Sequence, residues 1–210
     1  MMEQGNLPTQ RVNISTQKML GGIGSILTLL GWIPKIGTLL FIAGIVLWFI
    51  SIYQLSNILR KPSIFKKVLT GFILIIVGVV IAFASGLMAE ISSFTSIRGE
   101  TDVILEETDV TLEDVISEET HVTLELGLGG VVAIIVAYAI GIAAFYFYKE
   151  AFEILAQVTA HNLFKLAGLL LFIGAITTII LLGLLLIVVG YIVLAVAFFT
   201  APNEVEVQGT

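Results

Sequence analysis

The stretch LAGLLLFIGAITTIILLGLLLIVVGYIVLAVAFFT, residues 166–200, decides the fold class because it holds no charged side chain. The uncharged run continues to Asn203, and one continuous helix from Leu166 to Asn203 would be about 57 Å long. The hydrocarbon core of a bilayer is only about 30 Å thick. The run therefore has to fold back on itself. We expect the break at Gly183, which divides the run into two short membrane crossings.

The composition of the whole chain agrees with a membrane protein. The 210 residues are 58% hydrophobic and 12% charged, with a mean hydropathy of +1.07, whereas soluble domains are about 45–50% apolar and about 25% charged. A soluble globular domain is thereby excluded. Cysteine is absent, which excludes disulfide bonds and thiolate metal sites.

Five apolar stretches lie between the charged residues: Met19–Pro34, Ile36–Leu59, Val68–Ala89, Leu126–Tyr148 and Leu166–Asn203. About 20 residues cross a bilayer, so the third and fourth stretches are single spans. The sequence GWIPKIG at residues 31–37 is typical of a turn, and its Trp32 suits the headgroup level. We predict an all-α integral membrane protein with about six transmembrane helices in three hairpins. Five spans or a re-entrant pair are the alternatives.

The predicted organisation follows from these spans. A cytoplasmic N-terminal tail at residues 1–18 precedes membrane helices 1–3 at residues 19–90, which enclose a basic cytoplasmic loop at residues 54–67. An acidic insert at residues 91–125 separates them from membrane helices 4–6 at residues 126–200, with a cytoplasmic loop at 149–165 and a C-terminal tail at 201–210. Both loops mix polar and apolar side chains, so both can lie on the membrane surface as short amphipathic helices.

Lysine and arginine set the orientation, because cytoplasmic loops carry an excess of them. With six spans, one side of the membrane receives only Lys35 and Arg98. The other side receives Arg11, Lys18, Arg60, Lys61, Lys66, Lys67, Lys149 and Lys165. We therefore expect a multi-pass protein of the cell membrane with both termini in the cytoplasm. Trp48, Tyr53 and the run Phe145–Tyr148 would then be aromatic anchors at the cytoplasmic interface.

The net charge of −6 is unevenly distributed. Residues 91–125 hold ten acidic residues and one base, Arg98, for a charge of −9, and the rest of the chain sums to +3. Three related segments within residues 100–125 alternate Thr, Val and Leu with other residues, which is the period of a strand. We expect a small acidic extracytoplasmic insert that is either β or disordered. No glycine lies between Gly99 and Gly127, so a solvated acidic lid fits better than a calcium loop.

Small residues recur on two of the spans. In lipid, helices associate through close packing of such residues. The fourth span has Gly129, Ala133, Ala137 and Gly141 at intervals of four, and the third span has Gly78, Ala82 and Gly86. We expect a helix to pack on the ridge of the fourth span, either from the same chain or from a second copy in a homo-oligomer. The lipid bilayer is the other expected partner.

Groups that could carry chemistry are scarce. Ionisable residues inside a bilayer are kept chiefly for function, and the interior of every predicted span lacks Asp, Glu, Arg and His. The hydroxyl groups there belong to Ser25, Thr28, Ser51, Ser85, Tyr138, Thr177, Thr178 and Tyr191, and we expect them to bond mainly to their own helix backbone. No zinc-protease, P-loop, dinucleotide-binding or serine-hydrolase motif occurs. We therefore predict no catalytic, cofactor-binding or metal-ligating residue, no enzyme activity and, without a basic domain, no nucleic-acid binding.

Two internal similarities are visible. A shift of 146 residues places Gly22, Gly37 and Gly44 on Gly168, Gly183 and Gly190, and a shift of 99 places Ile64–Lys66 on Leu163–Lys165. The first would make the two terminal hairpins equivalent, as in the repeats of many transporters. Glycine and leucine are so frequent here that chance matches are the alternative.

The runs LGGIGSIL (residues 20–27), GWIPKIG (31–37), LFKLAGLLLFIGAI (163–176) and VLAVAFF (193–199) resemble a family of small, mainly archaeal membrane proteins, the domain of unknown function 996. The resemblance covers most of the chain except residues 91–125. It implies a polytopic membrane protein. It carries no established activity and no catalytic residues.

The sequence thus favours a non-enzymatic multi-span membrane protein with a structural or membrane-organising role. The alternative is a passive channel or facilitator, in which the acidic insert would form a cation-attracting outer mouth.

Overall fold

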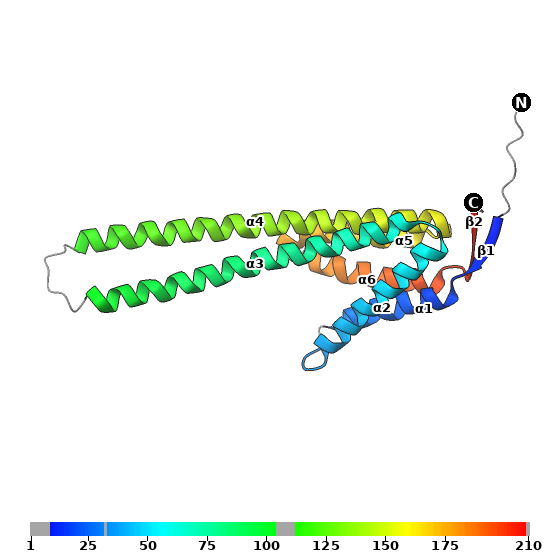
Figure 1. Cartoon of the computed structure of the whole chain (residues 1–210), viewed down its shortest axis with the longest axis horizontal. Coiled ribbons are helices and arrows are strands. Elements are labelled where there is room, and N and C mark those ends of the chain that lie inside the picture. Colours follow the sequence, from blue (N-terminus) through cyan, green and yellow to red (C-terminus); the bar gives the residue numbers. More distant parts are fainter. Residues whose placement is uncertain (1–8, 32, 104–111, 209–210) are drawn as a thin grey trace, which may run out of the picture. The chain divides into compact units, whose positions relative to one another are not determined.

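The computed structural model describes the backbone of residues 9–31, 33–103 and 112–208, and the side chains of residues 10–31, 33–85 and 130–207. Within these residues the helices are α1 (Ser15–Leu30), α2 (Gly37–Ile58), α3 (Pro62–Val103), α4 (Leu112–Thr159), α5 (Asn162–Thr177) and α6 (Leu182–Thr200), shown in Figure 1. A 3-10 turn, η1 (Thr178–Ile180), lies between α5 and α6. The strands are β1 (Thr9–Asn13) and β2 (Glu204–Gln208). Trp32 and the carboxylates of the acidic insert lie outside the described side chains.

The helices have the length and composition of membrane spans. Five segments are long and apolar enough to cross a bilayer: Gly37–Ile58, Pro62–Ser85, Gly130–Thr159, Asn162–Ile180 and Leu182–Thr200. α1 has 16 residues, which makes it about 24 Å long and shorter than the hydrocarbon core. The predicted all-α membrane fold is confirmed.

The last apolar run breaks slightly earlier than predicted. α5 ends at Thr177, and Leu181, with a φ of 56°, turns the chain into α6. Gly183 lies inside α6, where a β-carbon would collide with the backbone of Gly174 and Thr178. The prediction of Gly183 as the break was therefore wrong by two residues. Glycine permits a close backbone approach as well as a turn. Here Gly183 allows α6 to lie close to the end of α5.

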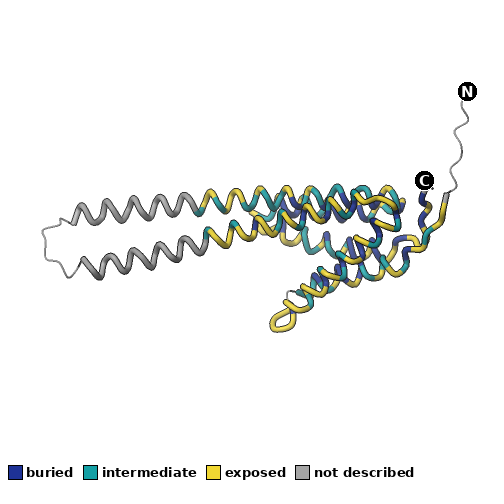
Figure 2. Tube along the Cα trace, viewed as in Figure 1, coloured by how far each residue is buried: buried dark blue, intermediate teal, exposed yellow. Residues whose placement is uncertain are grey.

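Contacts divide the chain into two units, Met1–Phe72 with Ile142–Thr210 and Ile73–Gly141. In the first unit the buried side chains gather on α1, α2, α5, α6 and the adjoining segments of α3 and α4 (Figure 2). Its largest fully buried side chains include Phe152, Phe164 and Phe198, each at most 1% exposed. This unit therefore has a packed apolar core of its own.

The second unit contains part of the small-residue ridge. A β-carbon at Gly78 would lie 3.3 Å from the carbonyl oxygen of Ala137, so α3 and α4 approach each other closely here, as the spacing indicated. A β-carbon at Gly141 would meet nothing within 4 Å. Gly129 and Gly86 lie outside the described side chains. Large apolar side chains of this unit such as Phe83, 71% exposed, face away from the protein, as expected where the neighbour is lipid.

The two basic connections are shorter than expected. α2 and α3 are joined by residues 59–61, and α4 and α5 by residues 160–161. Most of segments 54–67 and 149–165 therefore belongs to the ends of the long helices instead of forming separate surface helices.

The strands expected in the acidic insert are not found in its described parts. Residues 91–103 belong to α3 and residues 112–125 to α4, while residues 104–111 lie outside the described backbone. The strand prediction was wrong for the two helical segments. Extending a helix that has already formed needs no new nucleus, and Glu and Leu are good helix formers. These two effects outweigh the alternation of Thr, Val and Leu.

Within the tails predicted at residues 1–18 and 201–210, β1 and β2 pair as two antiparallel strands, while residues 15–18 already belong to α1. Val12 of β1 lies opposite Val205 of β2, and Gln10 lies opposite Val207. Val205 and Val207 are buried, whereas Glu204 and Glu206 are exposed. The alternation in EVEVQ, residues 204–208, is the signal that could have predicted β2.

The first internal similarity holds at the turns of the two terminal hairpins. Lys35 and Leu181 are 146 residues apart, and both have left-handed backbones, with φ of 73° and 56°. Two residues later, Gly37 and Gly183 approach the backbone on the other side of their turns. The two hairpins therefore turn in the same way at equivalent positions.

The second similarity falls at a shift of 100 instead of 99. Arg60 and Ala160 have φ of 54° and 53°, and the amides that follow them bond back to Ser56 and Ala156 at 3.0 and 3.1 Å. The pairs buried at this shift include Ser51 and Ala151, Ile52 and Phe152, Leu55 and Leu155, Ser56 and Ala156, Leu59 and Thr159, and Ile64 and Phe164. The segments α2–turn–α3 and α4–turn–α5 thus have the same local structure, and the register read from the letters was off by one.

Candidate functional site

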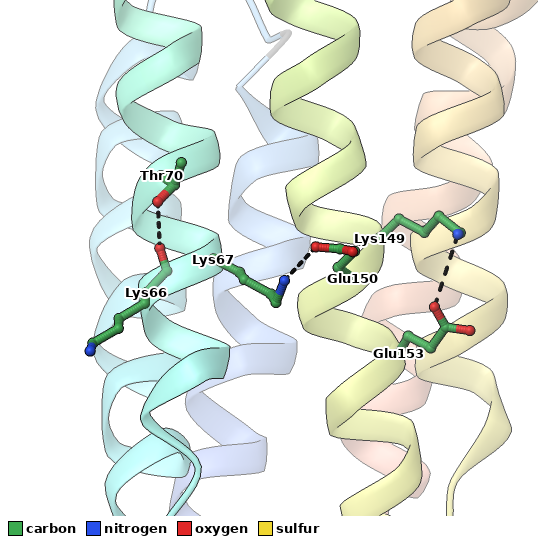
Figure 3. Close-up of polar contacts among 6 residues, drawn as sticks. All are labelled: Lys66, Lys67, Thr70, Lys149, Glu150 and Glu153. Atoms are coloured by element: carbon green, nitrogen blue, oxygen red, sulfur yellow. Dashed lines mark hydrogen bonds and ion pairs between the residues drawn. The ribbon is translucent and has the colours of Figure 1, made fainter.

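Five charged side chains of the first unit form two ion-paired groups near the ends of three helices. Lys67 comes from α3, Lys149, Glu150 and Glu153 come from α4, and Lys165 comes from α5. We call these residues the ion-pair network; Figure 3 shows all of them except Lys165. All except Lys165 have side chains about one third exposed. Water therefore screens these charges less than it screens those of a fully exposed pair.

Lys67 and Glu150 join α3 to α4. The Lys67 ammonium donates a hydrogen bond to the Glu150 carboxylate, and the two residues are 83 positions apart in the chain. A charge-assisted hydrogen bond is stronger than one between neutral groups. This pair fixes how the two helices lie at this level.

Glu153 lies between two cations and joins α4 to α5. Its carboxylate oxygens are 3.9 Å from Lys149 Nζ and 3.5 Å from Lys165 Nζ. Lys149 Nζ also lies 5.7 Å from the centre of the Tyr146 ring, within range of a cation–π interaction. Glu153 thus places a carboxylate between two ammonium groups across α4 and α5, on a different side of α4 from the Lys67–Glu150 pair (Figure 3).

Lys18 connects the first helix to the last. Its ammonium donates to the carbonyl oxygens of Ala201, at 2.7 Å, and Phe199, at 3.4 Å, at the C-terminal end of α6. The last carbonyls of a helix have no helical partner and carry partial negative charge. Lys18 therefore caps α6 while it belongs to α1.

Most hydroxyl groups of the spans bond to their own helix, as predicted. They belong to Ser25, Thr28, Ser85, Thr177 and Thr178. Ser51 differs, because its hydroxyl donates to the Gln17 carbonyl oxygen of α1 at 2.7 Å. The Gln17 side chain in turn donates to Gln54 at 3.2 Å. These bonds join α1 to α2.

Two of the predicted interfacial aromatic residues are core residues instead. Trp48 is 9% exposed and Tyr148 is 6% exposed, and their rings meet edge to face at a centroid distance of 5.8 Å. The Trp48 indole nitrogen is buried without a hydrogen-bond partner in the described part of the chain. Tyr53 and Tyr146 are 51% and 43% exposed, as an anchor requires. The anchor prediction was therefore wrong for Trp48 and Tyr148, because both lie on the packed face of their helix.

The family follows from a match over most of the chain. Residues 40–192, which run from α2 into α6, match the family described as "Protein of unknown function (DUF996)". The chain belongs to the DUF996 family. The DUF996 protein is also 29% identical over 201 residues to "Uncharacterized protein MJ1644" of Methanocaldococcus jannaschii, covering 93% of this chain and 97% of that protein. No solved structure matches it. The resemblance stated from the sequence is confirmed.

In the DUF996 protein, the charged residues of the ion-pair network pair with one another between helices. Glu150 and Glu153 each lie against a lysine, so both carboxylates are held by cations. Among the described residues, no three His, Asp or Glu side chains gather closely enough to hold a metal ion. The Lys67–Glu150 pair was not predicted from the sequence because its two residues are 83 positions apart in the chain. The signal that could have found it is the co-occurrence of Lys and Glu at the ends of successive spans.

Proposed function

We propose that this DUF996 protein is a non-enzymatic multi-span protein of the cell membrane with a structural or membrane-organising role. The observation that carries this proposal is that polar side chains of the first unit bond to neighbouring helices. Lys67 and Glu150 join α3 to α4, Glu153 joins α4 to α5, Lys18 joins α1 to α6, and Ser51 joins α1 to α2. A ligand site needs convergent polar groups that are free to meet the ligand, whereas these groups hold helices together.

The proposal places both termini in the cytoplasm. Basic residues gather on that side in a six-span arrangement, as the positive-inside rule requires. The pairing of β1 with β2 gives separate support, since two paired tails have to lie on the same side of a membrane.

The proposal also includes self-association through the ridge of Gly129, Ala133, Ala137 and Gly141. Gly141 supports it, because a β-carbon there would meet open space. Gly130, next to the ridge, is open in the same way. In lipid, such open glycines let a second helix approach closely.

The experiment uses the full chain in lipid vesicles. Because the chain has no cysteine, a single Lys66→Cys substitution on an exposed side chain allows separate donor-labelled and acceptor-labelled preparations. We expect energy transfer between co-reconstituted copies and a cation permeability equal to that of protein-free vesicles. Vesicles with gramicidin serve as the positive control for flux, and the Ala137→Leu variant tests whether the ridge carries the assembly. Because the Ala137 backbone also lies against Gly78 of α3, a melting temperature in detergent equal to that of the parent chain must show that this variant keeps its fold.

A cation flux above that of protein-free vesicles, which falls when residues 100–125 are deleted, would overturn the structural role in favour of a channel. Energy transfer that is absent, or unchanged by Ala137→Leu, would overturn self-association through the ridge.

A further inference from the structure

The turn between α5 and α6 exposes four consecutive large apolar side chains. Ile179, Ile180, Leu181 and Leu182 are 74%, 66%, 74% and 53% exposed. Burying one such side chain away from water is worth about 1.5–3 kcal/mol, so a turn of this composition is unfavourable in water. Apolar surroundings would stabilise this turn.

The length of α5 places this turn short of the far side of the membrane. Lys165, in the first turn of α5, has a charge that belongs at the headgroup level. From Lys165 to the end of α5 at Thr177 the helix rises about 18 Å, and the hydrocarbon core is about 30 Å thick. α6 holds no charged residue, so nothing on the returning helix draws the turn outward.

Part of the backbone of the turn is hydrogen-bonded within the protein. The amide of Leu181 donates to the Thr178 carbonyl oxygen, and the amide of Leu184 donates to the Leu181 carbonyl oxygen, both at 3.1 Å. The Thr177 and Thr178 hydroxyls donate to carbonyl oxygens within α5. Non-helical backbone is costly in hydrocarbon because its polar groups lack partners, and these bonds remove part of that cost.

The turn between α1 and α2 provides the contrast. Lys35 occupies the position equivalent to Leu181, with the same left-handed backbone, and Lys35 and the neighbouring Pro34 are exposed. A lysine and a proline suit the membrane interface, whereas leucine and isoleucine suit hydrocarbon. The two turns thus share a backbone conformation, but one carries polar side chains and the other carries apolar side chains.

We propose that α5 and α6 form a re-entrant hairpin, whose turn Thr178–Leu182 ends inside the hydrocarbon and is bound by lipid acyl chains of the leaflet opposite Lys165. The surface that meets the lipid consists of Ile179, Ile180, Leu181 and Leu182. This proposal does not depend on the proposed structural role, because it concerns only where one hairpin ends.

The test compares Leu181→Cys with Lys35→Cys in the full chain, each as the single cysteine, in lipid vesicles. A thiol in apolar surroundings stays protonated and reacts slowly. We expect a membrane-impermeant maleimide to label Lys35→Cys about tenfold faster or more than Leu181→Cys, with the reagent on both sides of the membrane. In denaturing detergent both variants should label equally, which shows that the Leu181→Cys thiol is intact. Elution of both variants with the parent chain on size exclusion confirms folding.

A nitroxide attached at each cysteine gives a second measurement. At position 181 we expect relaxation by oxygen, which dissolves in hydrocarbon, to exceed relaxation by a water-soluble nickel chelate, and at position 35 we expect the reverse. Equal labelling of the two variants, or stronger relaxation by nickel at position 181, would show that the turn lies in water. Protection of position 181 from both relaxation agents would show that protein covers it. Either outcome overturns the proposal.

Discussion

Gly44 of α2 lies so close to Thr28 of α1 that a β-carbon at position 44 would stand 2.5 Å from the Thr28 amide nitrogen. On the other side of the same contact, a β-carbon at Gly24 would stand 2.7 Å from the Trp48 amide nitrogen. The Thr28 hydroxyl bonds within α1 to the Gly24 carbonyl oxygen at 2.9 Å and lies at the same contact, 2.7 Å from the β-carbon position of residue 44. The backbones of α1 and α2 are thus in van der Waals contact, and this contact holds α1 against its neighbour. α1 and α5, with 16 residues each, are the shortest of the described α-helices.

Replacing Gly44 with alanine should lower the stability of the protein. The added methyl group forces the two helices apart, and overpacking of this kind costs about 1–3 kcal/mol. Thermal unfolding in detergent, followed by circular dichroism, measures the effect. Thr70→Ala is the control, because Thr70 is exposed, its hydroxyl bonds to Lys66 of its own helix, and alanine favours the helix. A melting temperature that falls equally in both variants would contradict the close contact at Gly44.

Replacing Glu150 with glutamine should also destabilise the protein. The substitution leaves the Lys67 ammonium partly buried without its carboxylate, and losing a hydrogen bond between charged groups costs about 1–3 kcal/mol. The same unfolding measurement applies. Glu206→Gln removes the Arg11–Glu206 pair, which has side chains 72% and 62% exposed, and should change stability by less than about 1 kcal/mol.

A double-mutant cycle separates the Lys67–Glu150 pair from other effects of each substitution. The double variant Lys67→Met with Glu150→Gln should lose less than the sum of the two single losses, since neither charge is then left alone. Additive losses would mean that the two side chains do not stabilise each other.

Replacing Ala160 with glycine should stabilise the protein. Ala160 has a φ of 53°, a left-handed backbone that costs an L-residue roughly 1–2 kcal/mol. Glycine avoids this cost but loses more entropy on folding, so the expected gain is about 0.5–1 kcal/mol. Ala143→Gly, at an exposed position within α4, is the control and should destabilise by up to about 1 kcal/mol. An Ala160→Gly variant that unfolds earlier than the parent chain would contradict the left-handed turn.

The sequence predicted what depends on the hydrocarbon core. The length and apolar character of residues 166–200 required two helices and a turn, because a longer helix does not fit the bilayer. The glycine spacing indicated that the two terminal hairpins are equivalent, since the same tight approach needs a glycine at the same distance from each turn. The self-bonding of Thr28 and Thr178 also followed, because it is local to one helix.

What the sequence could not predict depends on which helix faces lie together. Trp48 has the composition of an interfacial anchor, and only the packing of its helix shows that it is buried against Tyr148. The Lys67–Glu150 pair joins residues 83 positions apart, a relationship that no local pattern contains. The alternation of Glu and Val at residues 204–207 indicates a strand, but it does not indicate the partner strand at the other end of the chain.

Replacing Lys18 with methionine should weaken the attachment of α1 to α6. The ammonium of Lys18 donates to the carbonyl oxygens of Phe199 and Ala201, and methionine keeps most of the apolar stem while it removes the charge and the donor. A cation at a helix C-terminus is worth about 0.3–2 kcal/mol, depending on its burial, so the melting temperature in detergent should fall accordingly. Lys66→Met is the matched control, because the Lys66 side chain is exposed and caps no helix in the described part of the chain, and it should leave the melting temperature nearly unchanged. Amide hydrogen exchange locates the effect: in Lys18→Met the last turn of α6 should exchange faster, while α4 should not change. Equal exchange across α6 in both variants would show that Lys18 does not cap that helix.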